Sequence, residues 1–237
     1  MNKILQKYIA ERSNYSRRQA EELIRKGKVS VNGKTSELGQ KVAEEDVILV
    51  EGRSLQNKVS KIYIKLNKPK GYTCTNRKFK NELNVFELIE KPLLASPCQG
   101  EELSLFVVGR LDKESRGLVV LTNDGDWAQK MTHPKYEHEK EYRIKVKVQN
   151  SKLKSNILEK FIEGVDIGGG DGVVKAKKVE QIDNNIFKII LTQGKKRQIR
   201  RMFDSLGLEV IDLQRVRIGK IELGDLKEGD WGFLNKI

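Results

Sequence analysis

The side chain best placed to do chemistry is Asp112, which lies between two short apolar runs, residues 105–108 and 118–121. Both runs predict buried strands, with glycines at their junctions. Asp112 would therefore sit in a tight loop at the end of a sheet, close to Arg110. Loops anchored by strands commonly carry reactive groups. Because an aspartate in a turn also serves as a capping residue, its role depends on the rest of the chain.

The basic stretch 195–207 is the second segment whose residue types could take part in chemistry. At about 100° per residue its apolar side chains gather on one helix face. Arg197, Arg200 and Arg201 gather on the opposite face. Guanidinium groups form paired, charge-assisted hydrogen bonds with phosphate or carboxylate, so this face is suited to an anion. A merely solvated helix face is the alternative that the segment alone leaves open.

Charge and composition indicate a globular protein with an anionic partner. The 237 residues include 46 Lys+Arg and 33 Asp+Glu, giving a formal net charge of +13, which favours nucleic acid over a membrane surface. No apolar run reaches the roughly 18 to 20 residues needed to cross a bilayer, and residues 1–10 are unlike a signal peptide. We therefore expect a cytoplasmic protein with no membrane partner. Cys74 and Cys98 match neither a disulfide framework nor a zinc cluster.

Residues 1–52 predict a small module of two helices followed by strands. Ser16 and Gln19 have the spacing of a capping box that would begin the second helix, and Gly27 would end it. The pair at 32–33, Asn-Gly after an alternating strand, is a strong hairpin signal. Six basic residues gather around the second helix and the turn into the hairpin: Arg12, Arg17, Arg18, Arg25, Lys26 and Lys28.

The polar, non-periodic residues 53–60 predict a linker, and residues 61–237 predict a second, larger domain. Its helices and strands are interleaved with hairpins. This pattern favours an α+β fold on a mixed, largely antiparallel sheet flanked by helices. The expected elements are strands at 62–66, 142–148, 173–179 and 186–191, helices at 84–90 and 152–161, a short helix after residue 126, and a closing helix and strand. The glycine run 168–172 is expected to be a flexible hairpin connection.

Segments 16–24, 27–29 and 31–33 together resemble the S4 RNA-binding module over nearly all of residues 2–50. In that module the helix pair lies against structured RNA. Four further motifs, in chain order, resemble the pseudouridine synthases of the RsuA family, which act on ribosomal RNA and join an S4 module to a catalytic domain. They are Lys68-Pro69-Lys70-Gly71, Gly109-Arg110-Leu111-Asp112 with its continuation to 125, Lys140-Glu141-Tyr142, and residues 194–202.

The resemblance implies that one uridine is detached at N1, turned and rejoined through C5, without cofactor, metal or nucleotide. Asp112 would be the essential carboxylate, acting as nucleophile or general base. Tyr142 would stack on the displaced uracil, because a flipped base needs an aromatic face. Arg200 would pair with Asp112. The residues expected to contact RNA in this domain are Arg110, Lys140, Arg197, Arg201 and Lys68.

Ribosomal RNA or a pre-ribosomal particle is the implied partner of a monomeric enzyme. Residues 138–142 are slightly closer to the large-subunit enzymes of the family than to the small-subunit one. A small-subunit substrate is therefore one alternative. A binding-only ribosome assembly factor that keeps the fold without the activity is another, and the presence of Asp112, Tyr142 and Arg200 argues against it.

Overall fold

The structure is a computed structural model that describes residues 2–13, 15–55, 60–75, 80–89, 105–148 and 156–234. It divides into two compact units, one built on residues up to Ile62 and the other on most of the residues that follow. Each unit has its own core, and each is described by itself.

The N-terminal unit joins a helix pair to a small antiparallel sheet of strand order β3-β2-β5-β6. Its elements are β1 (Lys3–Ile4), α1 (Leu5–Arg12), α2 (Arg17–Arg25), β2 (Val29–Val31), β3 (Lys34–Thr35), β4 (Lys41–Val42), β5 (Ile48–Val50) and β6 (Arg53–Ser54). Buried side chains from both helices and from the strands make one core: Leu5, Tyr8, Ile9, Ala20, Ile24, Val29, Val31, Val42, Ile48 and Val50.

The two local signals in this unit are confirmed. The Gln19 amide donates to the Ser16 hydroxyl (3.3 Å), and the Ser16 amide donates to the Gln19 side chain (2.7 Å), so the capping box begins α2. Asn32 and Gly33 both have positive φ, 51° and 79°, as a type I′ hairpin turn between β2 and β3 requires. The predicted linker starts too early, because Arg53 pairs with Val50 and extends the sheet.

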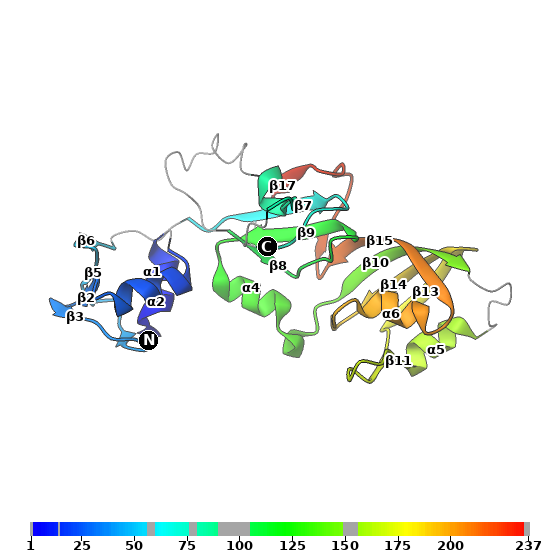
Figure 1. The fold of residues 1–237 in the computed structure, drawn as a ribbon, viewed down its shortest axis with the longest axis horizontal. Helices are drawn as coiled ribbons and strands as arrows, with labels where there is room; N and C mark the ends of the chain where they lie inside the picture. The colour runs from blue at the N-terminus through cyan, green and yellow to red at the C-terminus, as the bar shows by residue number, and fades with distance from the viewer. Residues whose placement is uncertain are drawn as a thin grey trace. The chain divides into compact units, whose positions relative to one another are not determined.

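The second unit is built on a nine-stranded sheet with the path β13-β14-β10-β15-β9-β7-β17, to which β8 and β16 are added at β9 and β15 (Figure 1). β15 pairs with β9 in parallel and with β10 and β16 antiparallel. The expected mixed, largely antiparallel sheet is thus confirmed. The strands are β7 (Tyr63–Lys68), β8 (Phe106–Val108), β9 (Arg116–Thr122), β10 (Lys140–Val148), β11 (Val165–Asp166), β12 (Val173–Val174), β13 (Lys178–Asp183), β14 (Ile186–Leu191), β15 (Leu208–Ile218), β16 (Ile221–Glu222) and β17 (Trp231–Phe233).

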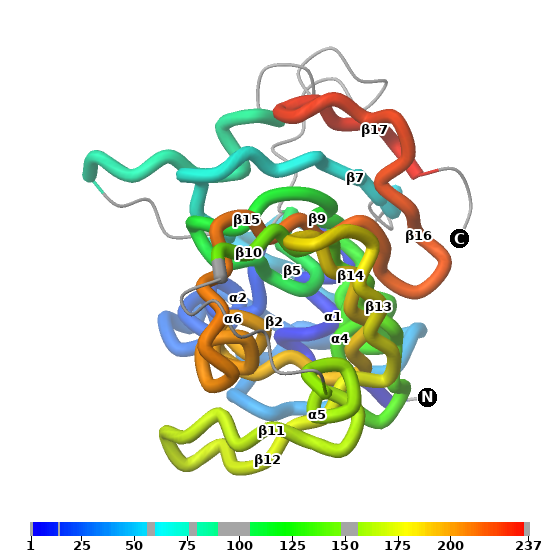
Figure 2. The backbone as a smooth tube through the Cα atoms, turned by 90° about the vertical axis from the view of Figure 1, so that its right-hand side faces the viewer, coloured from blue at the N-terminus to red at the C-terminus, as the bar shows by residue number. Residues whose placement is uncertain are grey.

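Helices α5 (Ile157–Glu163) and α6 (Gln198–Asp204) cover one face of this sheet, here called the inner face. The unit also contains α4 (Gly125–Thr132) and the short 3-10 turns η1 (Val85–Leu88) and η2 (Pro134–Tyr136). The ring of Phe203 in α6 lies 4.6 Å from that of Phe161 in α5 and 5.4 Å from that of Phe187 in β14. Figure 2 shows α5 and α6 on the same side of β10 and β15. On the opposite, outer face β10 carries polar residues, whereas β9 is buried from Gly117 to Thr122.

Three predicted elements differ in extent. The helix expected at 84–90 is the single turn η1, capped by Asn84. The strand expected at 173–179 is divided, because residues 173–174 form a hairpin with β11 and only β13 joins the main sheet. The glycine run is the connection in that hairpin, as predicted. Helix α5 begins at Ile157, and residues 152–155 of the expected helix lie outside the described residues.

Candidate active site

Asp112 lies in the loop 109–115, which joins β8 to β9. The Ser115 amide donates to the Asp112 carbonyl oxygen (3.1 Å) and closes a turn there. The Asp112 side chain is half-buried, and its carboxylate makes no hydrogen bond or ion pair with any described residue. A carboxylate held on an ordered loop with its oxygens free is available to a substrate.

Arg215 of β15 anchors the start of this loop. Its side chain is 1% exposed, and its guanidinium donates to the backbone oxygens of Leu118 (2.8 Å), Gly109 and Arg110 (3.5 Å). Gly117 lets the two strands meet, because a Cβ there would lie 2.3 Å from the Arg215 carbonyl oxygen. The arginine therefore connects the ends of the loop to the centre of the sheet.

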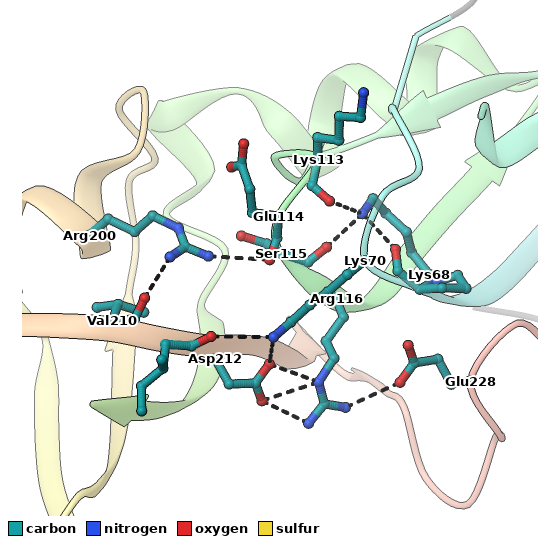
Figure 3. A network of polar contacts seen from close by, with 12 residues as sticks. Lys68, Lys70, Lys113, Glu114, Ser115, Arg116, Arg200, Val210, Asp212 and Glu228 are labelled. Carbon is teal, nitrogen blue, oxygen red and sulfur yellow. Dashed lines mark hydrogen bonds and ion pairs between the residues drawn. The ribbon is translucent and has the colours of Figure 1, made fainter. Parts of the chain in front are cut away.

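Lys68 anchors the end of the same loop. The side chain is fully buried, and Nζ donates to the carbonyl oxygens of Ser115 (2.6 Å), Pro69 (2.9 Å) and Lys113 (3.4 Å), as Figure 3 shows. The predicted RNA contact by Lys68 is wrong. A lysine that donates three hydrogen bonds to carbonyl groups in the interior supports the backbone and cannot reach a phosphate.

Arg200 of α6 holds the middle of the loop. Its guanidinium donates to the carbonyl oxygens of Val210 (2.9 Å) and Glu114 (3.2 Å), and the two contacts are drawn in Figure 3. Its Nε is buried and has no hydrogen-bond partner among the described residues. The ion pair expected between Arg200 and Asp112 is not formed between these two described residues. The guanidinium instead bonds the loop two residues further on.

The three cations surround the loop with positive charge. Burial lowers the pKa of Lys68, and the negative charge of Asp112 is among the groups that oppose this shift. Burial and then the charge of Arg197 lower the pKa of Arg200, and Asp112 again opposes the shift. Asp112 thus interacts electrostatically with both cations without being hydrogen-bonded to either.

Tyr142 lies in β10 directly beside Arg215 in β15, with Ile189 of β14 on its other side. It is 7% exposed and faces the inner side of the sheet. Arg215 is therefore the link between Tyr142 and the Asp112 loop. Lys140, on the same strand, donates to the carbonyl oxygens of His138 (3.3 Å) and Thr192 (3.4 Å). Burial and the charge of Arg215 lower its pKa.

The three remaining predicted cations have different surroundings. Arg110 is exposed and makes no ion pair with a described residue. Arg197 precedes α6 and pairs with Glu114 (2.7 Å). Arg201 bonds Asp171 and the carbonyl oxygens of Ile167 and two other residues. These bonds hold the Arg201 guanidinium on the β11–β12 hairpin, and its contact with RNA stays a prediction.

In the N-terminal unit, Arg12 is occupied within the fold. It pairs with Glu44 and its guanidinium carbon lies 4.4 Å from the centre of the Tyr8 ring. Lys26 pairs with Glu22 one turn earlier (2.6 Å). The other four predicted cations are exposed and make no ion pair with a described residue: Arg17, Arg18, Arg25 and Lys28.

Sequence reasoning missed Arg215, the residue that connects the site. The available signal was its position in β15: Leu213 is buried, and strand alternation places Arg215 on the same inner face. A charged residue at a core position of a strand requires buried acceptors. Within the described ranges, no three His, Cys, Asp or Glu side chains are arranged to hold a metal ion. The helices described there include none long and apolar enough to span a membrane.

Comparison with known proteins agrees with this arrangement. Residues 62–205 match the family described as RNA pseudouridylate synthase, and residues 5–48 match the S4 domain. The ribosomal large subunit pseudouridine synthase B of Bacillus subtilis is 37% identical, with 95% of this chain and 89% of that protein covered. The ribosomal small subunit pseudouridine synthase A of Pasteurella multocida is 32% identical, with 98% and 95% covered. A crystal structure of a pseudouridylate synthase superposes with a TM-score of 0.68 at 31% identity, covering 98% of this chain and 96% of that one. The chain belongs to the RNA pseudouridylate synthase family and carries an N-terminal S4 domain.

Proposed function

We propose that this protein isomerises a specific uridine of ribosomal RNA to pseudouridine. The observation that carries the proposal is the Asp112 carboxylate, which is free of described partners while its loop is bonded to three cations from separate segments. Relatives of similar length bear the names of ribosomal pseudouridine synthases. A carboxylate with free oxygens can meet a substrate directly, and one that must be placed accurately needs a fixed backbone.

The reaction exchanges one bond to the ribose for another. The N1–C1′ bond of uridine breaks, the uracil turns, and a C5–C1′ bond forms. The proton on C5 leaves to solvent and N1 takes up a proton, so substrate and product are isomers. As a nucleophile, Asp112 bonds C1′ as the base departs and is displaced when C5 attacks. As a general base, it removes the C2′ proton of the sugar as the base departs and returns a proton to C2′ when the C5–C1′ bond forms.

The proposed roles of the neighbouring residues follow from their positions. Tyr142 stacks on the flipped uracil, which repays part of the cost of removing the base from its stack. Arg200 holds the loop of Asp112 and contributes positive field. The exposed Arg110 contacts a phosphate of the flipped nucleotide's strand. Lys140 and Arg197 contact the RNA if they exchange their present partners.

The N-terminal unit is proposed to dock on RNA. In this proposal the S4 domain includes β6 and so extends to Ser54, a linker follows it, and residues 61–237 are the catalytic domain of a cytoplasmic, monomeric enzyme that works without cofactor. Its substrate is the large-subunit rRNA, free or in a pre-ribosomal particle. The small-subunit rRNA is the second candidate, because a small-subunit enzyme is also among the relatives.

Tritium release tests the chemistry. Purified protein should release tritium from rRNA transcripts labelled at C5 of uridine, because that proton is lost. Asp112→Asn should abolish release while keeping RNA affinity. Asp204→Asn is the matched control, since Asp204 is an exposed aspartate outside the site, and it should release label like the wild type. Equal release by Asp112→Asn and wild type would refute the assignment.

Mapping of pseudouridine in rRNA from cells with and without the gene identifies the subunit and the position. Loss of one modification in the large-subunit rRNA is the expected result. A binding-only assembly factor would leave every pseudouridine in place while particle assembly changed, and that outcome would contradict the proposed activity.

A further inference from the structure

A pocket of about 270 Å³ lies on the sheet of the second unit, lined by side chains from four strands. The lining residues are Arg116, Arg143, Lys145, Ile186, Asp212 and Gln214. None of them belongs to the predicted catalytic set. Three of the six are cations and one is a carboxylate, so the pocket is positively charged.

Strand alternation places this pocket on the outer face, opposite Tyr142. In β10, Tyr142 and Ile144 are buried, whereas Arg143, Lys145 and Lys147 are exposed. Consecutive residues of a strand point to opposite faces, and the buried set faces α5 and α6 because Ile144 pairs with Phe187. The three cations therefore form a row on the helix-free side of the sheet.

Two of the acidic groups near the row, Asp212 and Glu141, are already neutralised. Asp212 pairs with Arg116 (2.8 Å) and Lys70 (2.6 Å), and Figure 3 shows both contacts. Glu141, the outward residue that precedes the row on β10, pairs with Lys188 (3.0 Å) and Arg217 (3.0 Å).

The row itself is unpaired. Arg143, Lys145 and Lys147 make no ion pair with any described residue. Glu209 stands opposite Lys147 in the strand register without pairing with it. Arg143 and Lys145, which line the pocket, are thus the cations left with uncompensated charge.

The geometry of the row fits a phosphate chain. Residues two apart on a strand are separated by about 6.5–7 Å, which is comparable to the spacing of successive phosphates along a nucleic-acid strand. Arg116 lines the pocket and is the first residue after the loop that carries Asp112. A strand that delivers a uridine to Asp112 can therefore continue from the loop onto this row.

We propose that the outer face of the sheet, through Arg143 and Lys145, binds the sugar-phosphate backbone of the RNA substrate next to the modified nucleotide. The inference rests on the proposed function, because it takes RNA as the ligand. It adds a second contact surface in the catalytic domain, separate from both the S4 domain and the Asp112 loop. Such contacts hold the RNA in register and read no sequence.

The salt dependence of RNA binding tests this surface. The double variant Arg143→Gln/Lys145→Gln should reduce the slope of log affinity against log salt by about 1.4 to 1.8, since each lost phosphate contact removes roughly 0.7 to 0.9. The probe is a rRNA transcript that contains the mapped uridine. Lys175→Gln/Lys220→Gln is the control: both lysines are exposed and make no ion pair with a described residue, and the change in net charge is identical.

The inference is supported if only the outer-face variant has a smaller slope of log affinity against log salt than the wild type. It is overturned if that variant keeps the wild-type slope, or if the control loses as much. Urea unfolding of each variant verifies that the fold is retained. Tritium release by the wild type is measured on the same transcript: failure there refutes the proposed activity, whereas an unchanged slope in the presence of release refutes the outer-face site alone.

Discussion

Replacing Arg215 with methionine removes the donors that connect β15, the strand beside that of Tyr142, to the Asp112 loop, while keeping an unbranched side chain. Two short hydrogen bonds are lost, to the carbonyl oxygens of Leu118 and Gly109. The contact to Arg110 at 3.5 Å is too long to count. A hydrogen bond from a charged donor contributes about 1.5–3 kcal/mol, so the two bonds give about 3–6 kcal/mol.

Part of this loss is offset. Arg215 is 1% exposed and makes no ion pair with a described carboxylate, so its burial costs free energy that the variant regains. We therefore expect the lower end of the range, about 3 kcal/mol in the free energy of unfolding. Urea denaturation followed by circular dichroism measures it directly. Arg217→Met is the matched control, because Arg217 lies two residues along the same strand and its part-buried ion pairs with Glu139 and Glu141 do not involve the Asp112 loop.

The catalytic effect separates positioning from general stability. Because the loop that carries Asp112 loses its anchor, a displacement of the order of 1 Å can lower kcat by about 100-fold. KM for the rRNA transcript should change little, since Arg215 is buried and cannot contact RNA. Tritium release at a temperature where both variants are fully folded gives kcat and KM. If Arg215→Met unfolds at the wild-type urea midpoint, or keeps the wild-type kcat, the anchoring role is refuted.

Three further outcomes are expected. Gly117→Ala should lower the free energy of unfolding by about 3 kcal/mol, because its methyl group would lie 2.3 Å from the Arg215 carbonyl oxygen at a φ of +103°. Gly172→Ala, whose methyl group would lie in open space, should cost about 1 kcal/mol. Thermal unfolding measures both, and equal costs would contradict the steric argument. Burial alone would raise the pKa of Asp212, but hydrogen bonds from Arg116 and Lys70 keep it below its ordinary value. Its stabilisation is therefore present above about pH 4 and lost as pH falls through the folded-state pKa, so Asp212→Asn should lose about 1 kcal/mol at pH 7 and progressively less in acid. Arg17→Ala and Arg18→Ala should each shallow the salt slope of RNA binding by roughly 0.7 to 0.9, and Arg12→Ala, whose guanidinium is already paired with Glu44, should leave it unchanged.

Local signals predicted much of the fold because they depend on neighbours in the chain. The capping box at Ser16, the turn at residues 32–33 and the alternation in β10 all involve contacts within a few residues or between adjacent strands. The same reasoning placed Asp112 in a loop between two buried strands. The helix at 84–90 was overestimated because a capped 3-10 turn has the same start signal as an α-helix.

The partners of the cations could not be predicted in this way. Lys68 and Arg201 are of residue types that commonly contact RNA, yet both donate to backbone carbonyl groups of distant segments. Lys68 reaches residues 113–115, which follow it by more than 40 positions along the chain. Every residue has a backbone carbonyl group, so the sequence does not show which carbonyl will accept a hydrogen bond. The order of strands in the sheet decides which carbonyls a buried cation meets.

This distinction changes how the net charge of +13 is interpreted. A cation that satisfies interior carbonyls adds to the charge count but offers no hydrogen bond to phosphate. Lys68 and Arg215 belong to this group, and their charge instead raises the potential around the loop that carries Asp112. Binding of RNA must then depend on exposed cations without acidic partners, such as Arg110 and Arg143. The positive charge thus has two separable roles, to support the Asp112 loop from the interior and to bind RNA at the surface. Salt should weaken RNA binding far more than the buried contacts, because buried interactions are poorly screened.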